Sequence, residues 1–122
     1  MRSHKDLIVW QKSMTLVTRL YDVTQAFPKE ELFGITSQMR RAAVSVPSNI
    51  AEGYGRMYGK ETVKFLSNAM GSASELETQL LICRRLSLGT PDELHELLSL
   101  TEEILRMLSS LARTVDLTAR NA

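Results

Sequence analysis

The residue types that most often carry enzymatic or metal chemistry are few in this sequence and stand far apart. The chain has two histidines, His4 and His95, and one cysteine, Cys83. Zinc sites need several histidine or cysteine ligands at short spacing, and none of these three residues has such a neighbour. Cys83 also falls on an apolar periodic stripe, which favours a buried thiol over a nucleophile. The sequence therefore predicts no metal site and no cofactor.

Carboxylates and glycines form no catalytic pattern either. Glu75 and Glu77 share one predicted helix without the paired geometry that a hydrolase needs. Residues 52–59 read Glu-Gly-Tyr-Gly-Arg-Met-Tyr-Gly, but this segment matches no phosphate-binding loop and has no strand before it. We interpret it as a helix–helix connection, and we expect no catalytic residues and no enzymatic activity.

Adjacent arginines form the first of two polar clusters with a candidate role. If the helices on either side of residue 57 pair, residue 41 lies opposite residue 73, so Arg40 or Arg41 could reach Glu75. This pairing predicts an ion pair, either within the chain or between subunits. The alternative is an arginine pair offered to phosphate or to an acidic partner.

Asn49 is the central residue of the second polar cluster, which runs from Ser45 to Gly53. It follows Val46 by three residues and so shares the inner face of the predicted helix. Pro47 removes one helical hydrogen bond, and a nearby amide can satisfy the freed backbone. This position favours a structural role for Asn49 over a ligand contact.

Four periodic stretches must position these groups. We predict helices over residues 6–25, 30–52, 60–86 and 91–117, with Gly34 as an alternative start of the second. Asp6 and Thr90 are the predicted caps of the first and last helices. Short connections favour antiparallel neighbours. The sequence thus predicts a single all-α domain over residues 1–122, an antiparallel up-down-up-down four-helix bundle.

Each predicted helix has an apolar face with spacings of three and four residues. The first helix has its stripe at Leu7, Trp10, Met14, Val17 and Tyr21, widened by Leu16, Leu20 and Val23. The second has Ile35, Met39, Ala42, Val46 and Ile50, and we predict that Pro47 bends this helix without ending it. The third has Leu66, Ala69, Ala73, Leu76, Leu80 and Cys83.

Two features predict a homo-oligomer. The last helix has more leucines than one bundle face can bury, so it is either central or also covered by another subunit. The middle of the third helix is rich in glycine, alanine and serine. Since glycine costs a helix about 1 kcal/mol relative to alanine, such a run suits a helix that another helix approaches closely.

Charge is nearly balanced along the chain, with a net charge of +1. In the predicted bundle, however, one end gathers eight basic and four acidic residues and the other three basic and seven acidic residues. The candidate contacts with nucleic acid or a partner at the basic end are Arg56, Lys60, Lys64, Arg113 and Arg120. The alternative is a solvated surface whose charges are unevenly distributed.

Targeting signals are not apparent in the sequence. Its first residues lack the apolar run of a signal peptide, and no stretch reaches the roughly 18 apolar residues of a membrane span. One unpaired cysteine suits a reducing compartment. We therefore expect a cytoplasmic protein without a membrane partner.

Several segments together resemble one protein family. They are Trp10-Gln11-Lys12, the run from Phe27 to Ala43 (FPKEELFGITSQMRRAA), Val46 to Gly53 (VPSNIAEG), and Gly71-Ser72 with Glu75 to Leu80 (ELETQL). In this order they resemble the bacterial four-helix-bundle proteins of the 23S ribosomal RNA intervening sequences. The resemblance implies a cytoplasmic ring, typically a homopentamer. It also implies kinship with the accessory protein of diversity-generating retroelements, which binds a reverse transcriptase and nucleic acid.

These observations predict a non-enzymatic, oligomeric interaction module. The expected partners are other copies of the chain, together with RNA, DNA or a nucleic-acid-handling protein. The alternative is a protein-only adaptor ring that docks a partner protein. A phosphate contact would weaken steeply with salt, whereas an apolar docking surface would not.

Overall fold

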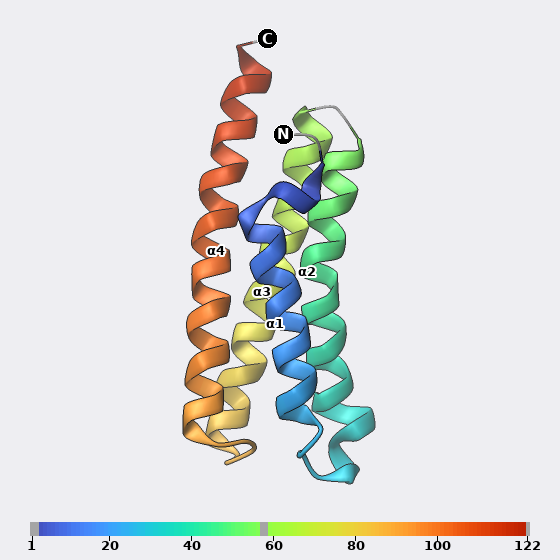
Figure 1. Ribbon diagram of the computed structural model, residues 1–122, viewed down its shortest axis with the longest axis vertical. Coiled ribbons are helices and arrows are strands. Elements are labelled where there is room, and N and C mark those ends of the chain that lie inside the picture. Colours follow the sequence, from blue (N-terminus) through green and yellow to red (C-terminus); the bar gives the residue numbers. More distant parts are fainter. Residues whose placement is uncertain (1–2, 57–58, 122) are drawn as a thin grey trace.

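The computed structural model describes residues 3–56 and 59–121. These residues form four long helices, α1 (Ile8–Thr24), α2 (Ser37–Gly55), α3 (Gly59–Arg85) and α4 (Pro91–Arg120), and no strand. Figure 1 shows them side by side, with the chain reversing direction from each helix to the next. α3 packs against α2 and α4, and α1 packs against the same two helices, so the bundle closes around one core.

The start of α1 differs from the prediction. Asp6 does not cap this helix but lies in a short 3-10 helix, η1 (His4–Asp6), whose own cap is Ser3, with the Lys5 amide donating to Ser3 Oγ at 3.1 Å. Leu7 is extended and buried, and α1 begins after it without a side-chain cap. Burial of Leu7 in the core therefore fixes the boundary between the two helices.

The predicted second helix is divided. Residues Lys29–Glu31 form a 3-10 turn, η2, and Leu32–Thr36 form a π-helical turn, η3, whose backbone leaves helical geometry at Gly34 (φ −108°, ψ −119°). The α-helix begins only at Ser37, so a start at Glu30 was wrong, and the alternative at Gly34 was three residues early. The break at Gly34 directs Leu32 and Phe33 outward, where both side chains are exposed.

α2 continues through Pro47 to Gly55, as the phase of Val46 and Ile50 predicted. Pro47 leaves the Ala43 carbonyl without its helical donor, but Asn49 and Ser48 bond to other backbone carbonyls. Ser48 Oγ donates to the Val44 carbonyl at 2.8 Å, and Asn49 Nδ2 donates to the Ser45 carbonyl at 2.8 Å. Asn49 thus bonds within its own helix, and both its predicted structural role and the bend at Pro47 stay predictions.

The N-terminal cap of α4 is Thr90, the residue predicted from the sequence. Thr90 Oγ1 accepts from the Glu93 amide at 3.1 Å, and the Thr90 amide donates to Glu93 Oε1 at 3.2 Å. This reciprocal capping box precedes Pro91 as the first helical residue. α4 runs three residues beyond the predicted end, and Figure 1 shows its C-terminal turns extending past the other helices.

The core confirms the predicted stripes of α2 and α3 but shifts that of α1. On α1 the buried side chains are Val9, Ser13, Leu16, Leu20 and Val23, whereas Met14 and Tyr21 are exposed. The stripe that was predicted as central therefore lies at the edge of the core. Both candidate stripes are apolar, so periodicity alone did not distinguish them.

Most leucines of α4 are covered by the same chain, as expected of a helix central to the bundle. Besides its fully buried residues, α4 has apolar side chains that are partly buried against the core: Leu100, Leu105, Met107, Leu111 and Val115. Among the described residues of α4, Leu117 alone is a largely exposed leucine. The exposed apolar surface of the molecule lies mainly on α1, η3, α2 and α3.

Candidate interaction surfaces

Arg56, at the C-terminal end of α2, is held by its own chain. Its guanidinium lies 2.7 Å from Glu52 Oε1 and 3.9 Å from Glu61 Oε2, and it stands over the Phe65 ring at 5.3 Å. Glu52 is one turn earlier on α2, and Glu61 lies in the first turn of α3. The arginine therefore joins the two helices at their connection, and much of its charge is balanced locally.

Close helix packing positions this corner. A Cβ added at Gly53 would lie 3.0 Å from Phe65 Cβ and 3.3 Å from the Thr62 carbonyl oxygen. Thr62 Oγ1 donates to the Gly53 carbonyl at 2.8 Å. Glycine thus lets α3 approach the end of α2, which brings Phe65 under Arg56.

Of the other predicted basic contacts, Arg120 is paired with Asp116 at 3.1 Å. Lys60, Lys64 and Arg113 are exposed and carry no ion pair within residues 3–56 and 59–121. In Figure 1 the start of α3 and the end of α4 lie at the same end of the bundle. Of the five predicted contacts, these three therefore keep an unpaired charge among the described residues, and we call Lys60, Lys64 and Arg113 the basic patch.

The two central arginines point to different neighbours. Arg40 Nε donates to Thr24 Oγ1 at 3.0 Å, and its guanidinium lies 4.4 Å from the centre of the Tyr21 ring, so Arg40 joins α2 to α1. Arg41 Nη2 reaches Ser37 Oγ at 3.5 Å. Neither forms an ion pair with Glu75 or another carboxylate among the described residues. Pairing between subunits stays a prediction.

A shallow polar cleft of about 240 Å³ separates Arg41 from Glu75. Ser45 on α2 and Ser72 on α3 both line the cleft, and their hydroxyls form a hydrogen bond of 2.8 Å. Asn49 Nδ2 donates to Ser45 Oγ at 2.9 Å and fixes that hydroxyl from one side. The sequence placed these residues on facing helices correctly, but it did not distinguish an ion pair from an open cleft between the two charges.

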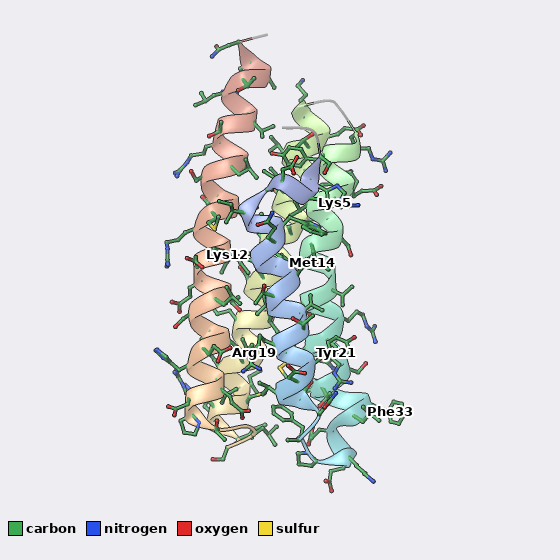
Figure 2. The ribbon with its side chains drawn as sticks, in the orientation of Figure 1. Lys5, Lys12, Met14, Arg19, Tyr21 and Phe33 are labelled. Atoms are coloured by element: carbon green, nitrogen blue, oxygen red, sulfur yellow. The ribbon has the colours of Figure 1, made fainter. Side chains whose placement is uncertain are left out.

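Several apolar side chains are exposed where α1 and η3 meet α2, and the sequence did not predict this apolar seam. They are Met14, Tyr21, Leu32, Phe33 and Val44. Phe33 is 93 % exposed, and Figure 2 shows its ring projecting away from the bundle beside η3. The available signal was an apolar pair, Leu32-Phe33, just before a glycine at the start of a helix, where the chain can turn such a pair outward.

The residues considered for enzymatic or metal chemistry remain separate. Burial, with a smaller effect of Glu31, raises the pKa of the Cys83 thiol to about 11, and Cys83 Sγ lies 3.6 Å from Met39 Sδ. His4 packs edge-on against Trp10 with ring centres 5.2 Å apart. In the described part of the chain, no three histidine, cysteine or carboxylate side chains gather as metal ligands.

Fold and surface together define a four-helix bundle whose distinctive groups lie on its outside: a basic patch, a polar cleft and an apolar seam. A family model named 23S rRNA-intervening sequence protein matches residues 5–110. The chain therefore belongs to the family of 23S rRNA-intervening sequence proteins, as the order of its motifs indicated.

Comparison with curated proteins finds no match to the chain. Within the described residues, no helix combines the length and the apolar character that crossing a membrane would need.

Proposed function

We propose that this protein is a non-enzymatic interaction module that assembles with copies of itself. The observation that supports self-assembly is the composition of the outward face of α3. Leu81 and Ile82 are 38 % and 42 % exposed there, one helical turn from Thr78. A Cβ added at Gly71, seven residues before Thr78, would meet no atom of the described residues within 4 Å, so no contact in that part of the chain requires glycine at this position.

Close approach of a second copy would account for both features. Glycine lowers helix stability by about 1 kcal/mol relative to alanine, and an exposed aliphatic pair favours burial by a partner. Membership of the intervening-sequence family supports a ring, and by resemblance a homopentamer. A cytoplasmic location and the absence of a cofactor belong to the same proposal.

Light scattering at micromolar concentration tests self-assembly. Wild type is expected to be oligomeric, and Leu81→Asp/Ile82→Asp is expected to dissociate it. Leu117→Asp, on the exposed tail of α4, is the control and should leave the mass unchanged. A monomeric wild type would overturn the proposal, and an unchanged double variant would show that assembly uses another face.

The second proposed function is phosphate contact by the basic patch. Lys60 and Lys64 are one helical turn apart on α3, and Arg113 on α4 adds a third cation that no carboxylate of the described chain neutralises. Three charges bind nucleic acid weakly, but copies in a ring would repeat the patch and add their contacts. RNA, DNA or a ribonucleoprotein is the expected partner.

Binding of a mixed-sequence RNA at two salt concentrations tests this contact. Lys60→Glu/Lys64→Glu should abolish the salt-sensitive binding, because each lost phosphate contact lowers the salt slope. Arg84→Glu/Arg85→Glu makes the same charge change at the other end of α3 and should retain binding. If wild type does not bind at low salt, or if both variants behave alike, a protein-only adaptor becomes the better function.

A further inference from the structure

A second group of unpaired cations lies far from the basic patch, in a groove between α1, η3 and the start of α2. The groove has a volume of about 500 Å³. Its apolar walls are Tyr21, Leu32, Phe33 and Val44, and its polar residues are Ser37, Arg40 and Arg41. Figure 2 labels two of these lining residues, Tyr21 on α1 and Phe33 in η3.

Contacts within the chain fix the Arg40 side chain in a position where it can bind an anion. The hydrogen bond of 3.0 Å to Thr24 Oγ1 uses its Nε, and the Tyr21 ring covers one face of the guanidinium at 4.4 Å. These contacts leave both terminal nitrogens for another acceptor. Neither Arg40 nor Arg41 has a carboxylate within ion-pair distance in the part of the chain that the structure describes.

A smaller cavity of about 230 Å³ adjoins the groove, because Arg40 and Leu32 line both. Thr36 and Lys29 also line this cavity. Thr36 is only 1 % exposed, and its hydroxyl has no hydrogen-bond partner among the described residues. A buried hydroxyl that lacks a partner costs free energy, so an acceptor bound beside Arg40 would satisfy it as well.

We propose that this groove binds a carboxylate attached to an apolar chain. The carboxylate would accept hydrogen bonds from Arg40, with Arg41 adding charge and Thr36 a hydroxyl. The apolar chain would lie against Leu32, Phe33 and Val44. A guanidinium fork matches the two oxygens of a carboxylate, and the apolar walls match a ligand that is hydrophobic beyond that group.

The surroundings favour one carboxylate over a polyanion. Glu30 and Glu31 directly precede Leu32, and Glu31 Oε2 lies 3.6 Å from the position that a Cβ at Gly34 would take, while Asp22 follows Tyr21 and pairs with Arg19 at 3.5 Å. These carboxylates would repel a nucleic-acid backbone or a dianionic phosphate more than a single negative charge. The groove therefore differs in chemistry from the basic patch. Two sources share the proposed ligand chemistry: a free apolar acid and a peptide with an apolar C-terminal residue.

Titration calorimetry of the full chain tests the site with four probes. They are 3-phenylpropanoate, acetyl-leucyl-phenylalanine with a free carboxylate, the same dipeptide as its carboxamide, and inorganic phosphate. At least one of the two carboxylates should bind, and the stronger identifies the source. The carboxamide should bind about tenfold more weakly or not at all, because it loses the charged hydrogen bonds to Arg40.

Variants locate the site on the molecule. Arg40→Gln should weaken carboxylate binding about tenfold or more, and Thr36→Val should weaken it less. Phe33→Ser should also weaken it, and this variant leaves the fold intact because the ring is almost fully exposed. Arg106→Gln, which removes an exposed arginine of α4, is the matched control and should bind as wild type does.

Four results would overturn the proposal. They are binding of neither carboxylate at millimolar concentration, equal affinity for the carboxamide, tighter binding of inorganic phosphate, and equal losses from Arg106→Gln and Arg40→Gln. Thermal unfolding followed by circular dichroism checks that each variant is folded. If Arg40→Gln unfolds, Phe33→Ser and the pair of acid and amide still decide the question.

Discussion

Arg56 was predicted as a contact for nucleic acid, and the structure surrounds it with groups of its own chain. It contacts Glu52, Glu61 and the Phe65 ring while remaining about half exposed. We expect Arg56→Ala to lower the free energy of unfolding by about 1 kcal/mol, because it removes an exposed ion pair and a cation–π contact. Urea unfolding of wild type and variant measures this difference.

Arg113→Ala is the control for that prediction, since Arg113 is exposed and has no ion pair in the described part of the chain. Its unfolding free energy should stay within about 0.5 kcal/mol of wild type. Equal effects of the two variants would mean that Arg56 has no special structural role. A charge reversal at Arg56 would change the stability of the fold together with any RNA binding. The RNA experiment therefore changes only Lys60 and Lys64.

Glu96 gives a prediction about pH. Its carboxylate lies 2.7 Å from Arg19 Nε across the α1–α4 contact, and the hydrogen bond from Arg19 lowers the pKa of Glu96. A carboxylate whose pKa is lower in the folded state stabilises the fold above its unfolded pKa of about 4.3, and this contribution is lost as the pH falls. Glu96→Gln should therefore melt below wild type at pH 7.

The difference in melting temperature between wild type and Glu96→Gln should shrink as the pH falls below about 4, where the wild-type carboxylate becomes protonated. Glu102→Gln, which removes an exposed carboxylate that has no ion pair in the described chain, should melt close to wild type at every pH. A difference for Glu96→Gln that does not change with pH would contradict the role assigned to the ion pair.

Between elements, the end of α4 packs closely against the start of α3. A Cβ added at Gly59 would clash with Ala119 Cβ, and the nearby atoms are backbone and a short side chain that cannot turn away. Gly59→Ala should therefore push the last turns of α4 off the bundle and lower the free energy of unfolding by about 1 kcal/mol or more. Hydrogen exchange of residues 115–120 reports the displacement.

Two further variants make this prediction specific. Ala119→Gly in the Gly59→Ala background removes the opposing methyl group and should restore protection of the α4 tail. Gly55→Ala adds the same methyl group where no atom of the described residues lies within 4 Å, so its α4 tail should exchange as in wild type. Loss of protection in the Gly55→Ala variant, or no rescue by Ala119→Gly, would rule out the steric explanation.

The elements themselves were largely predictable, because their signals are local. Thr90 with Glu93, the stripes of α2 and α3, and the continuation through Pro47 all follow from spacing within one helix. The inward face of α1 was not predictable in this way, because the helix has two apolar stripes. Only packing against α2 and α4 determines which stripe is buried. The break at Gly34 was missed for a similar reason: an apolar pair turned outward resembles the first turn of an amphipathic helix.

On the scale of the whole molecule, the leucines of α4 predicted a helix that is either central to the bundle or also covered by another subunit. α1 and α3 cover most of these leucines within one chain, and cover by a second copy stays a prediction. The candidate site was only partly predictable. Sequence placed Lys60, Lys64 and Arg113 at one end, but which carboxylate lies within reach of Arg56 depends on how the α2–α3 connection closes. The packing of α3 against the end of α2 depends on the close contact between Gly53 and Thr62. A count of charges along the sequence does not reveal this contact.

Both ends of the described chain, η1 and the last turns of α4, lie at the same end of the bundle as the end of α2 and the start of α3 (Figure 1). A partner domain or purification tag fused to either terminus would therefore crowd the basic patch and leave the opposite end open. Joining the termini by a flexible linker and reopening the chain at Ser87–Gly89 would reverse this arrangement. The permuted chain keeps the Thr90 capping box at its new start, so it should retain the helical circular dichroism of wild type. Attachments would then emerge beside η2 and η3, and the lysines of α3 would face solvent unhindered.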